Sequence, residues 1–183
     1  MRFGIIGLGR IGGNLALQAM EKGHEVVGHS KSDKELKDLS SKGLEPACSV
    51  KDVIEKLDFP RIVFLYIPHG KPLDNVCDEI KKYLQKDDIL IDGGNSHWKG
   101  SALQYEEFKK LGVHFLDCGT SGGLEGARNG VCFMVGGDSE LSEWNAWDEQ
   151  VVDKIKIEKV HTYNTARRAG DWVKTDIIPK LGK

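Results

Sequence analysis

The chain has 183 residues and a net charge of −2 at pH 7, with 39% hydrophobic and 30% charged residues. This composition is typical of a globular protein with one core, and the near-neutral charge gives no reason to expect a nucleic-acid or membrane partner. No apolar run approaches the roughly 18 residues that a membrane-spanning helix needs. The four cysteines have no CxxC spacing, and no group of metal ligands is evident. We therefore expect reduced thiols, a cytoplasmic location and no bound metal.

Short apolar runs alternate with segments of helical period over residues 1–160. This alternation predicts parallel strand pairing, and therefore an α/β fold with a doubly wound, Rossmann-type sheet. The tail at 161–183 fits the pattern poorly, so we expect a first domain over 1–160 and a helical or irregular appendage after it. A glycine-rich loop is expected between the sixth and seventh strands. In chain order, the expected strands are Arg2–Ile6, His24–Gly28, Leu44–Cys48, Arg61–Tyr66, Asp88–Asp92, Val113–Asp117, Val131–Val135 and Lys154–Val160, and the expected helices are Arg10–Lys22, Asp33–Ser41, Ser49–Leu57, Leu73–Leu84, Ser101–Leu111 and Ser139–Gln150.

The first expected strand leads into GLGRIG at residues 7–12, a GxGxxG pattern that also opens the first expected helix. In this setting the first glycine permits a tight turn, the second lets a pyrophosphate approach the backbone, and the third lets the helix pack on the strand. The helix N-terminus offers free N–H groups to phosphate. The other interpretation is an ordinary tight turn. The candidate cofactor-binding residues here are Gly7, Leu8, Gly9, Arg10, Ile11 and Gly12.

The end of the second expected strand bears on which dinucleotide is bound. Proteins that prefer NAD usually carry an acidic residue there, which binds the ribose 2′-hydroxyl. In this chain the strand is followed by His29, Ser30 and Lys31, with no carboxylate before Asp33. A hydroxyl and a cation suit a 2′-phosphate, so we expect NADP, with NAD as the other possibility. Lys31 could equally be a solvated loop charge.

Two further glycine-rich segments follow strands: DGGNS at residues 92–96, and CGTSGG at 118–123, which continues to Gly130. Ligands bind at the carboxyl ends of strands in open α/β sheets, and bare backbone lets a ligand come close. Adjacent glycines can also present N–H groups to an anion. We therefore expect these loops to form a pocket for a small acid, although each could be a flexible connection. Asn95→Ala is expected to weaken ligand binding and hardly to change stability.

These motifs together resemble 6-phosphogluconate dehydrogenase, a decarboxylating member of the β-hydroxyacid dehydrogenases. The resemblance rests on GLGRIG, DGGNS, GTSGG, GARNG and FMVGG, and spans about residues 1 to 160. It implies a Rossmann-type domain, a nicotinamide cofactor and a sugar-phosphate acid, 6-phosphogluconate, as substrate. It implies that Asn95 lies between nicotinamide and sugar, and that the bare backbone around it lets the two meet. It also implies that Ser121, Gly122 and Gly123 hold the substrate, and that Ile67, Pro68 and His69 lie against the cofactor.

The resemblance weakens towards the C-terminus. Lys174 aligns with the family's catalytic base, but Ile177 and Ile178 occupy the positions of its His-Asn pair, and the family's acid falls near Leu181. We therefore expect the family's helical domain, which completes the substrate site and the dimer, to be absent. Lys174 could also be a surface lysine. The chain could be an NADP-dependent oxidoreductase, a module that binds dinucleotide without turnover, a relative acting on another β-hydroxyacid, or a protein completed by more chain or a second subunit as a homo-oligomer.

Overall fold

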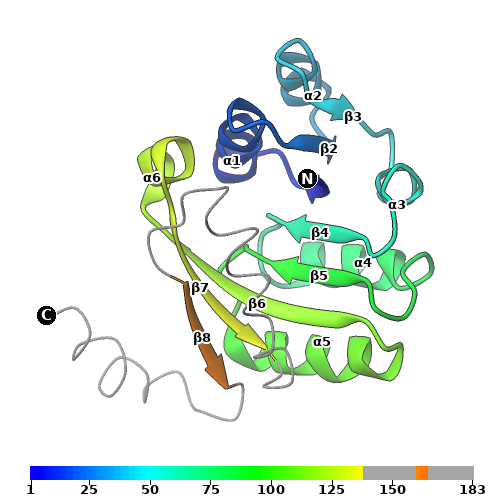
Figure 1. Cartoon of the computed structure of the whole chain (residues 1–183). Coiled ribbons are helices and arrows are strands. Elements are labelled where there is room, and N and C mark those ends of the chain that lie inside the picture. The colour runs from blue at the N-terminus through cyan, green and yellow to red at the C-terminus, as the bar shows by residue number, and fades with distance from the viewer. Residues whose placement is uncertain (138–159, 165–183) are drawn as a thin grey trace, which may run out of the picture.

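The computed structural model describes residues 1–137 and the backbone of the strand at 160–164. Within these residues eight strands form one sheet, in the order β3-β2-β1-β4-β5-β6-β7-β8 (Figure 1). Neighbours from β3 to β6 are parallel, which confirms the expected doubly wound, Rossmann-type sheet. β7 runs antiparallel to β6, and β8 runs parallel to β7. The sheet is thus mainly parallel, as expected, and β7 departs from that pattern because the connection at 122–131 is shorter than the dozen or so residues that a parallel crossover needs.

The elements follow the expected order, and most of their ends lie within a few residues of the expected ones. The segment expected to be only a glycine-rich loop contains a helix, α6. The last strand begins at Val160, where it was expected to end, and so crosses the expected domain boundary. The helix expected over Ser139–Gln150 lies outside the described residues. The strands are β1 (Arg2–Ile6), β2 (Glu25–His29), β3 (Glu45–Pro46), β4 (Ile62–Leu65), β5 (Ile89–Asp92), β6 (His114–Ser121), β7 (Cys132–Gly137) and β8 (Val160–Asn164), and the helices are α1 (Arg10–Glu21), α2 (Asp33–Ser40), α3 (Val50–Glu55), α4 (Lys71–Ile80), α5 (Trp98–Lys110) and α6 (Gly123–Asn129).

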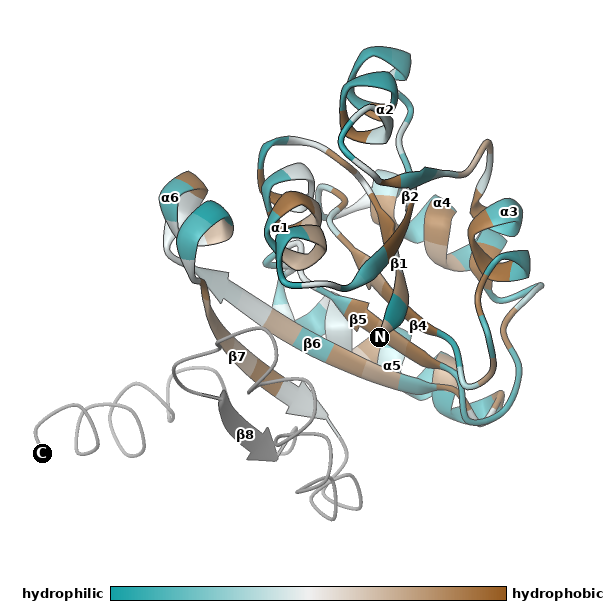
Figure 2. Cartoon of the chain, turned by 45° about the horizontal axis from the view of Figure 1, so that its top comes forward, coloured by the Kyte–Doolittle hydropathy of each residue, from teal (hydrophilic) through white to brown (hydrophobic). Residues whose placement is uncertain are grey.

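The two faces of the sheet bury two separate apolar clusters, because successive side chains of a strand point to opposite faces. In β5, Leu90 belongs to the cluster under α3, α4 and α5, whereas Ile89 and Ile91 belong to the cluster under α1, α2 and α6. Figure 2 shows β1, β4 and β5 largely as hydrophobic ribbons between helices that carry both hydrophilic and hydrophobic residues. Both faces are therefore covered, as expected for strands that read as continuous apolar runs.

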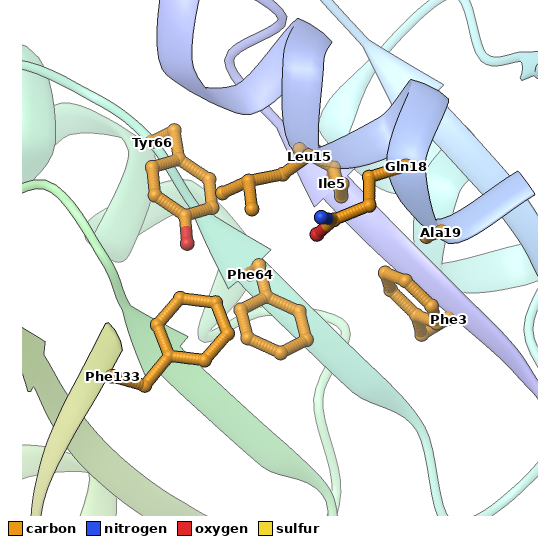
Figure 3. Close-up of a pocket in the computed structure, with 8 residues that line it drawn as sticks. All are labelled: Phe3, Ile5, Leu15, Gln18, Ala19, Phe64, Tyr66 and Phe133. Atoms are coloured by element: carbon orange, nitrogen blue, oxygen red, sulfur yellow. The ribbon is translucent and has the colours of Figure 1, made fainter. Parts of the chain in front are cut away.

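A small apolar pocket lies on the α1 side of the sheet, between that helix and strands β1, β4 and β7 (Figure 3). The ring of Tyr66 forms one end of the pocket and the ring of Phe3 the other. The remaining lining residues are Ile5, Leu15, Gln18, Ala19, Phe64 and Phe133. Tyr66 contacts the loop at Gly93, and Phe133 is the register partner of Thr120 in the third glycine-rich segment. The pocket therefore adjoins the edge of the sheet where those loops meet. No helix in the part of the chain described is both long and apolar enough to cross a membrane.

Candidate functional site

The glycine-rich loops follow β1, β5 and β6, and all three therefore lie at the carboxyl edge of the parallel part of the sheet. The chain order reverses between β1 and β4, because β1 continues to β2 on one side and β4 lies on its other side. Open α/β sheets bind ligands at this point, where loops on either side diverge. The fold thus places the three motifs around this reversal point, outside which the ligand crevice of such sheets lies.

In the first loop, two of the three glycines are required by the protein's own packing. Gly7 has a φ of +97°, and its N–H donates to the His29 carbonyl at 2.9 Å. A Cβ on Gly7 would lie 2.4 Å from the carbonyl oxygen of Tyr66, and a Cβ on Gly12 would lie 2.1 Å from that of Gly7. Gly9 differs, because no atom of the residues that the structure describes, apart from its chain neighbours, lies within 4 Å of its Cβ position. Gly9 is therefore the glycine that leaves room for a ligand.

The N-terminus of α1 fits the pyrophosphate of a dinucleotide. Gly9 caps the helix without a side-chain hydrogen bond, and its first turn has no acidic residue. The free N–H groups and the helix dipole are thus available to an anion. Leu8 is buried, so only its backbone can face a ligand, whereas Ile11 is partly buried and packs against the cluster under α1, α2 and α6. Arg10 is exposed at the start of the helix.

At the end of β2 the structure places a carboxylate that sequence reasoning missed. The Ser30 hydroxyl donates to Oε2 of Glu35 at 2.9 Å and accepts from the N–H of Ser32 at 3.2 Å. Ser32 caps α2, and the turn into this helix brings Glu35 back towards the strand end. The signal was in the sequence, since a Ser N-cap followed three residues later by Glu is a helix-start pattern. Lys31 is exposed.

In the second loop, the segment that follows β4 occupies the space beside both glycines, where a side chain would lie. A Cβ on Gly93 would lie 2.6 Å from the ring of Tyr66, and a Cβ on Gly94 would lie 2.5 Å from the Ile67 carbonyl oxygen. Packing within the protein therefore requires glycine at these two positions. The loops after β4 and β5 are packed in direct contact, and side chains on either glycine would separate them.

Asn95 joins the second loop to the third. It has a φ of +55°, in the left-handed region that Asn tolerates better than most residues. Its Oδ1 accepts from the N–H of Thr120 at 3.0 Å, and its Nδ2 donates to the Thr120 carbonyl at 3.3 Å. The side chain of Asn95 is exposed, yet both its amide oxygen and its amide nitrogen are hydrogen-bonded. The expectation that Asn95 contributes little to stability conflicts with this geometry.

Tyr66 contacts all three loops, and sequence reasoning assigned it no such role. Its carbonyl lies against Gly7, its ring against Gly93, and its hydroxyl 3.4 Å from Oγ1 of Thr120. Its own N–H donates to the Ile6 carbonyl at 2.9 Å, which fixes it at the end of β4. Burial raises the pKa of the Tyr66 hydroxyl, so it stays neutral. Tyr66 therefore sets the spacing of the crevice.

The expected substrate residues lie at the junction of β6 and α6. Ser121 is the last residue of the strand, and Gly122 and Gly123 have φ values of +122° and +61°. All three are exposed, and Ser121 directly follows the Thr120 to which Asn95 is bonded. The structure thus brings Asn95 and Ser121 to the same edge. The position of Lys174, the expected base, lies outside the described residues.

Two carboxyl groups lie beneath the second and third loops. Asp92 and Asp117 are register partners on β5 and β6, and Oδ1 of Asp92 accepts from the N–H of Gly94 at 2.9 Å. Burial raises the pKa of Asp92. Burial, and secondarily the charge of Asp92, raises the pKa of Asp117 to about 6. The pair was not recognised in the sequence because the two residues meet only through strand pairing.

The segment after β4 supplies the remaining expected cofactor residues. Ile67 is partly buried, whereas Pro68 and His69 are exposed. The ring of His69 lies 6.3 Å from that of His97, from the second loop. Among residues 1–137 and 160–164, no group of three His, Cys, Asp or Glu side chains could hold a metal ion.

This fold and this set of loops define a dinucleotide-binding domain of the oxidoreductase class. Residues 2–148 match the model of the NAD-binding domain of 6-phosphogluconate dehydrogenase. The chain belongs to the 6-phosphogluconate dehydrogenase family, and these residues form its NAD(P)-binding domain.

Individual relatives agree with this assignment. YqeC of Bacillus subtilis (strain 168), provisionally named a 6-phosphogluconate dehydrogenase, is 39% identical over 95% of this chain and 57% of its own length. The decarboxylating 6-phosphogluconate dehydrogenase 1 of Saccharomyces cerevisiae is 41% identical over 75% of this chain and 29% of its own. A structure of 6-phosphogluconate dehydrogenase from Plasmodium falciparum superposes with a TM-score of 0.75 at 29% identity, covering 93% of this chain and 35% of that one. The chain thus spans about half or less of the length of these relatives.

Proposed function

We propose that this chain is the nucleotide-binding part of an enzyme that oxidises and decarboxylates 6-phosphogluconate with NADP or NAD. The names of the relatives in Bacillus subtilis and Saccharomyces cerevisiae support this substrate. The observation that carries the proposal is the pair of hydrogen bonds between the side chain of Asn95 and the backbone of Thr120. This pair holds the substrate loop that begins at Ser121 against the crevice in which the nicotinamide would lie.

In this proposal the first loop holds the cofactor's pyrophosphate through the backbone at Gly9 and the N-terminus of α1. The bound nicotinamide supplies the acceptor for a hydride from C3 of the sugar acid. Lys174 takes the proton of the C3 hydroxyl, and Asn95 contacts both cofactor and substrate. Ser121, Gly122 and Gly123 hold the carboxylate end. The β-keto acid so formed loses carbon dioxide, because the new carbonyl at C3 accepts the electron pair of the broken bond and regains the proton from Lys174. Protonation of the resulting enediol at C2 by water then gives the pentulose phosphate.

We further propose that the chain divides after β8 and not at residue 160. Residues 160–164 pair with β7 and therefore belong to the sheet. The segment from 165 onwards would then begin the part that completes the substrate site, and it contains the proposed base, Lys174.

The proposal is tested by following the absorbance of reduced nicotinamide when the chain is mixed with NADP or NAD and either 6-phosphogluconate or 3-hydroxyisobutyrate. Reduction that depends on 6-phosphogluconate, releases carbon dioxide and is lost in Lys174→Gln is the expected result. Lys183→Gln is the matched control, because it removes the same charge from the same terminal segment, and it should keep the activity. Faster reduction with 3-hydroxyisobutyrate, or reduction that survives Lys174→Gln, would contradict the proposed substrate or base.

A further inference from the structure

The surroundings of Ser30 combine one feature that favours NAD with another that favours NADP. β2 pairs with β1 up to the pair Ile6↔His29, and the Gly7 N–H donates to the His29 carbonyl. Ser30 is therefore the first residue beyond the strand and lies next to the loop that would carry the pyrophosphate. In dinucleotide-binding sheets this position faces the ribose 2′-group of the adenosine half.

The hydroxyl of Ser30 is not free to donate to a phosphate. It donates to Oε2 of Glu35 at 2.9 Å, while its oxygen accepts from the Ser32 N–H at 3.2 Å. Glu35 is partly buried and is held from its own side, because its N–H donates to the Ser32 hydroxyl. The carboxylate is thus fixed on Ser30 by the start of α2.

We propose that Glu35 is a specificity-determining residue that disfavours the 2′-phosphate of NADP relative to the 2′-hydroxyl of NAD. A 2′-hydroxyl can donate to the Ser30–Glu35 pair, whereas a 2′-phosphate brings negative charge towards a fixed carboxylate. Lys31, which is exposed beside Ser30, opposes Glu35 by attracting the phosphate. The preference between NAD and NADP is then set by the balance between repulsion of the 2′-phosphate by Glu35 and its attraction by Lys31. The inference concerns nucleotide binding alone and does not depend on the proposed sugar substrate.

The test is a titration of the full chain with NAD and with NADP, without any sugar acid, in the wild type and in Glu35→Gln. Gln keeps a carbonyl that can accept from Ser30 but removes the charge. The ratio Kd(NADP)/Kd(NAD) is expected to fall about tenfold in Glu35→Gln, mainly through tighter NADP binding. This change should shrink in roughly 0.5 M salt, because screening weakens charge repulsion.

Asp38→Asn is the matched control. Asp38 lies on the same helix, is exposed, and pairs with Lys42 at 2.7 Å, so its replacement makes the same change in net charge away from Ser30. An unchanged ratio in Asp38→Asn supports the proposal. A ratio in Glu35→Gln within about twofold of the wild type, or an equal shift in Asp38→Asn, would overturn it.

Discussion

The side chain of Asn95 bonds both backbone groups of Thr120, accepting from its N–H at 3.0 Å and donating to its carbonyl at 3.3 Å. The amide thereby extends the pairing of β5 with β6 beyond Asp92, where the strand itself ends. The loop after β5 is thereby tied to the loop that carries Ser121. The same residue that the family resemblance places at the reaction centre thus also holds the site together.

Asn95→Ala should lower the free energy of unfolding by about 1–3 kcal/mol. The change removes two hydrogen bonds and leaves a residue poorly suited to a φ of +55°. Urea denaturation measures the loss. Asn95→Gly separates the two causes, because Gly accepts the backbone conformation but cannot make the bonds. Wild-type stability in Asn95→Ala would show that the contacts with Thr120 contribute nothing.

Gly93→Ala should destabilise the protein by about 1–3 kcal/mol, because its methyl group would meet the Tyr66 ring at 2.6 Å. The clash requires the ring, so the same change should cost much less when Tyr66 is replaced by Ala. A double-mutant cycle of unfolding free energies measures this coupling. Additive losses would show that the two residues do not contact each other as described.

Gly9→Ala should leave the melting temperature unchanged while weakening NADP binding. Apart from the chain neighbours of Gly9, no atom of the described residues lies within 4 Å of the added methyl group, and the φ of Gly9 is −65°, which alanine adopts freely. The methyl would instead occupy the side from which the pyrophosphate approaches. A thermal melt measures the melting temperature, and a calorimetric titration with NADP measures the affinity. Unchanged affinity would place the pyrophosphate elsewhere.

The free energy of unfolding should decrease as the pH rises through the range in which Asp117 loses its proton. Its pKa is raised from 3.8 to about 6, mainly by burial, so the folded state holds the proton more tightly than the unfolded state does. The stabilisation from this proton is fully present below the pKa of Asp117 in the unfolded chain, about 3.8, and is lost once the pH has passed the folded pKa of about 6. The loss amounts to at most about 3 kcal/mol. Asp117→Asn should flatten this part of the curve of unfolding free energy against pH, and an unaltered slope would contradict the assignment.

Sequence reasoning predicted the parallel sheet because its apolar runs are long and its helices periodic, and it located all three loops. It failed where a residue's role depends on a distant partner. The glycines at 93 and 94 signal close approach in the sequence, but only the fold shows that Tyr66 and Ile67 make the approach. Glu35 was passed over because the distance to Ser30 is set by a turn, and the reversal of β7 depends on the length of its connection.

The central claim is that the three loops form one site, with the cofactor on the first and the sugar acid on the third. Backbone amide chemical shifts of the labelled chain, recorded during titration with NADP and then with 6-phosphogluconate, test it most directly. NADP is expected to shift Gly9 and its neighbours in α1, and the sugar acid to shift Ser121, Gly122 and Gly123. Shifts confined to the part of the apolar pocket formed by Phe3 and Phe64 would contradict the account.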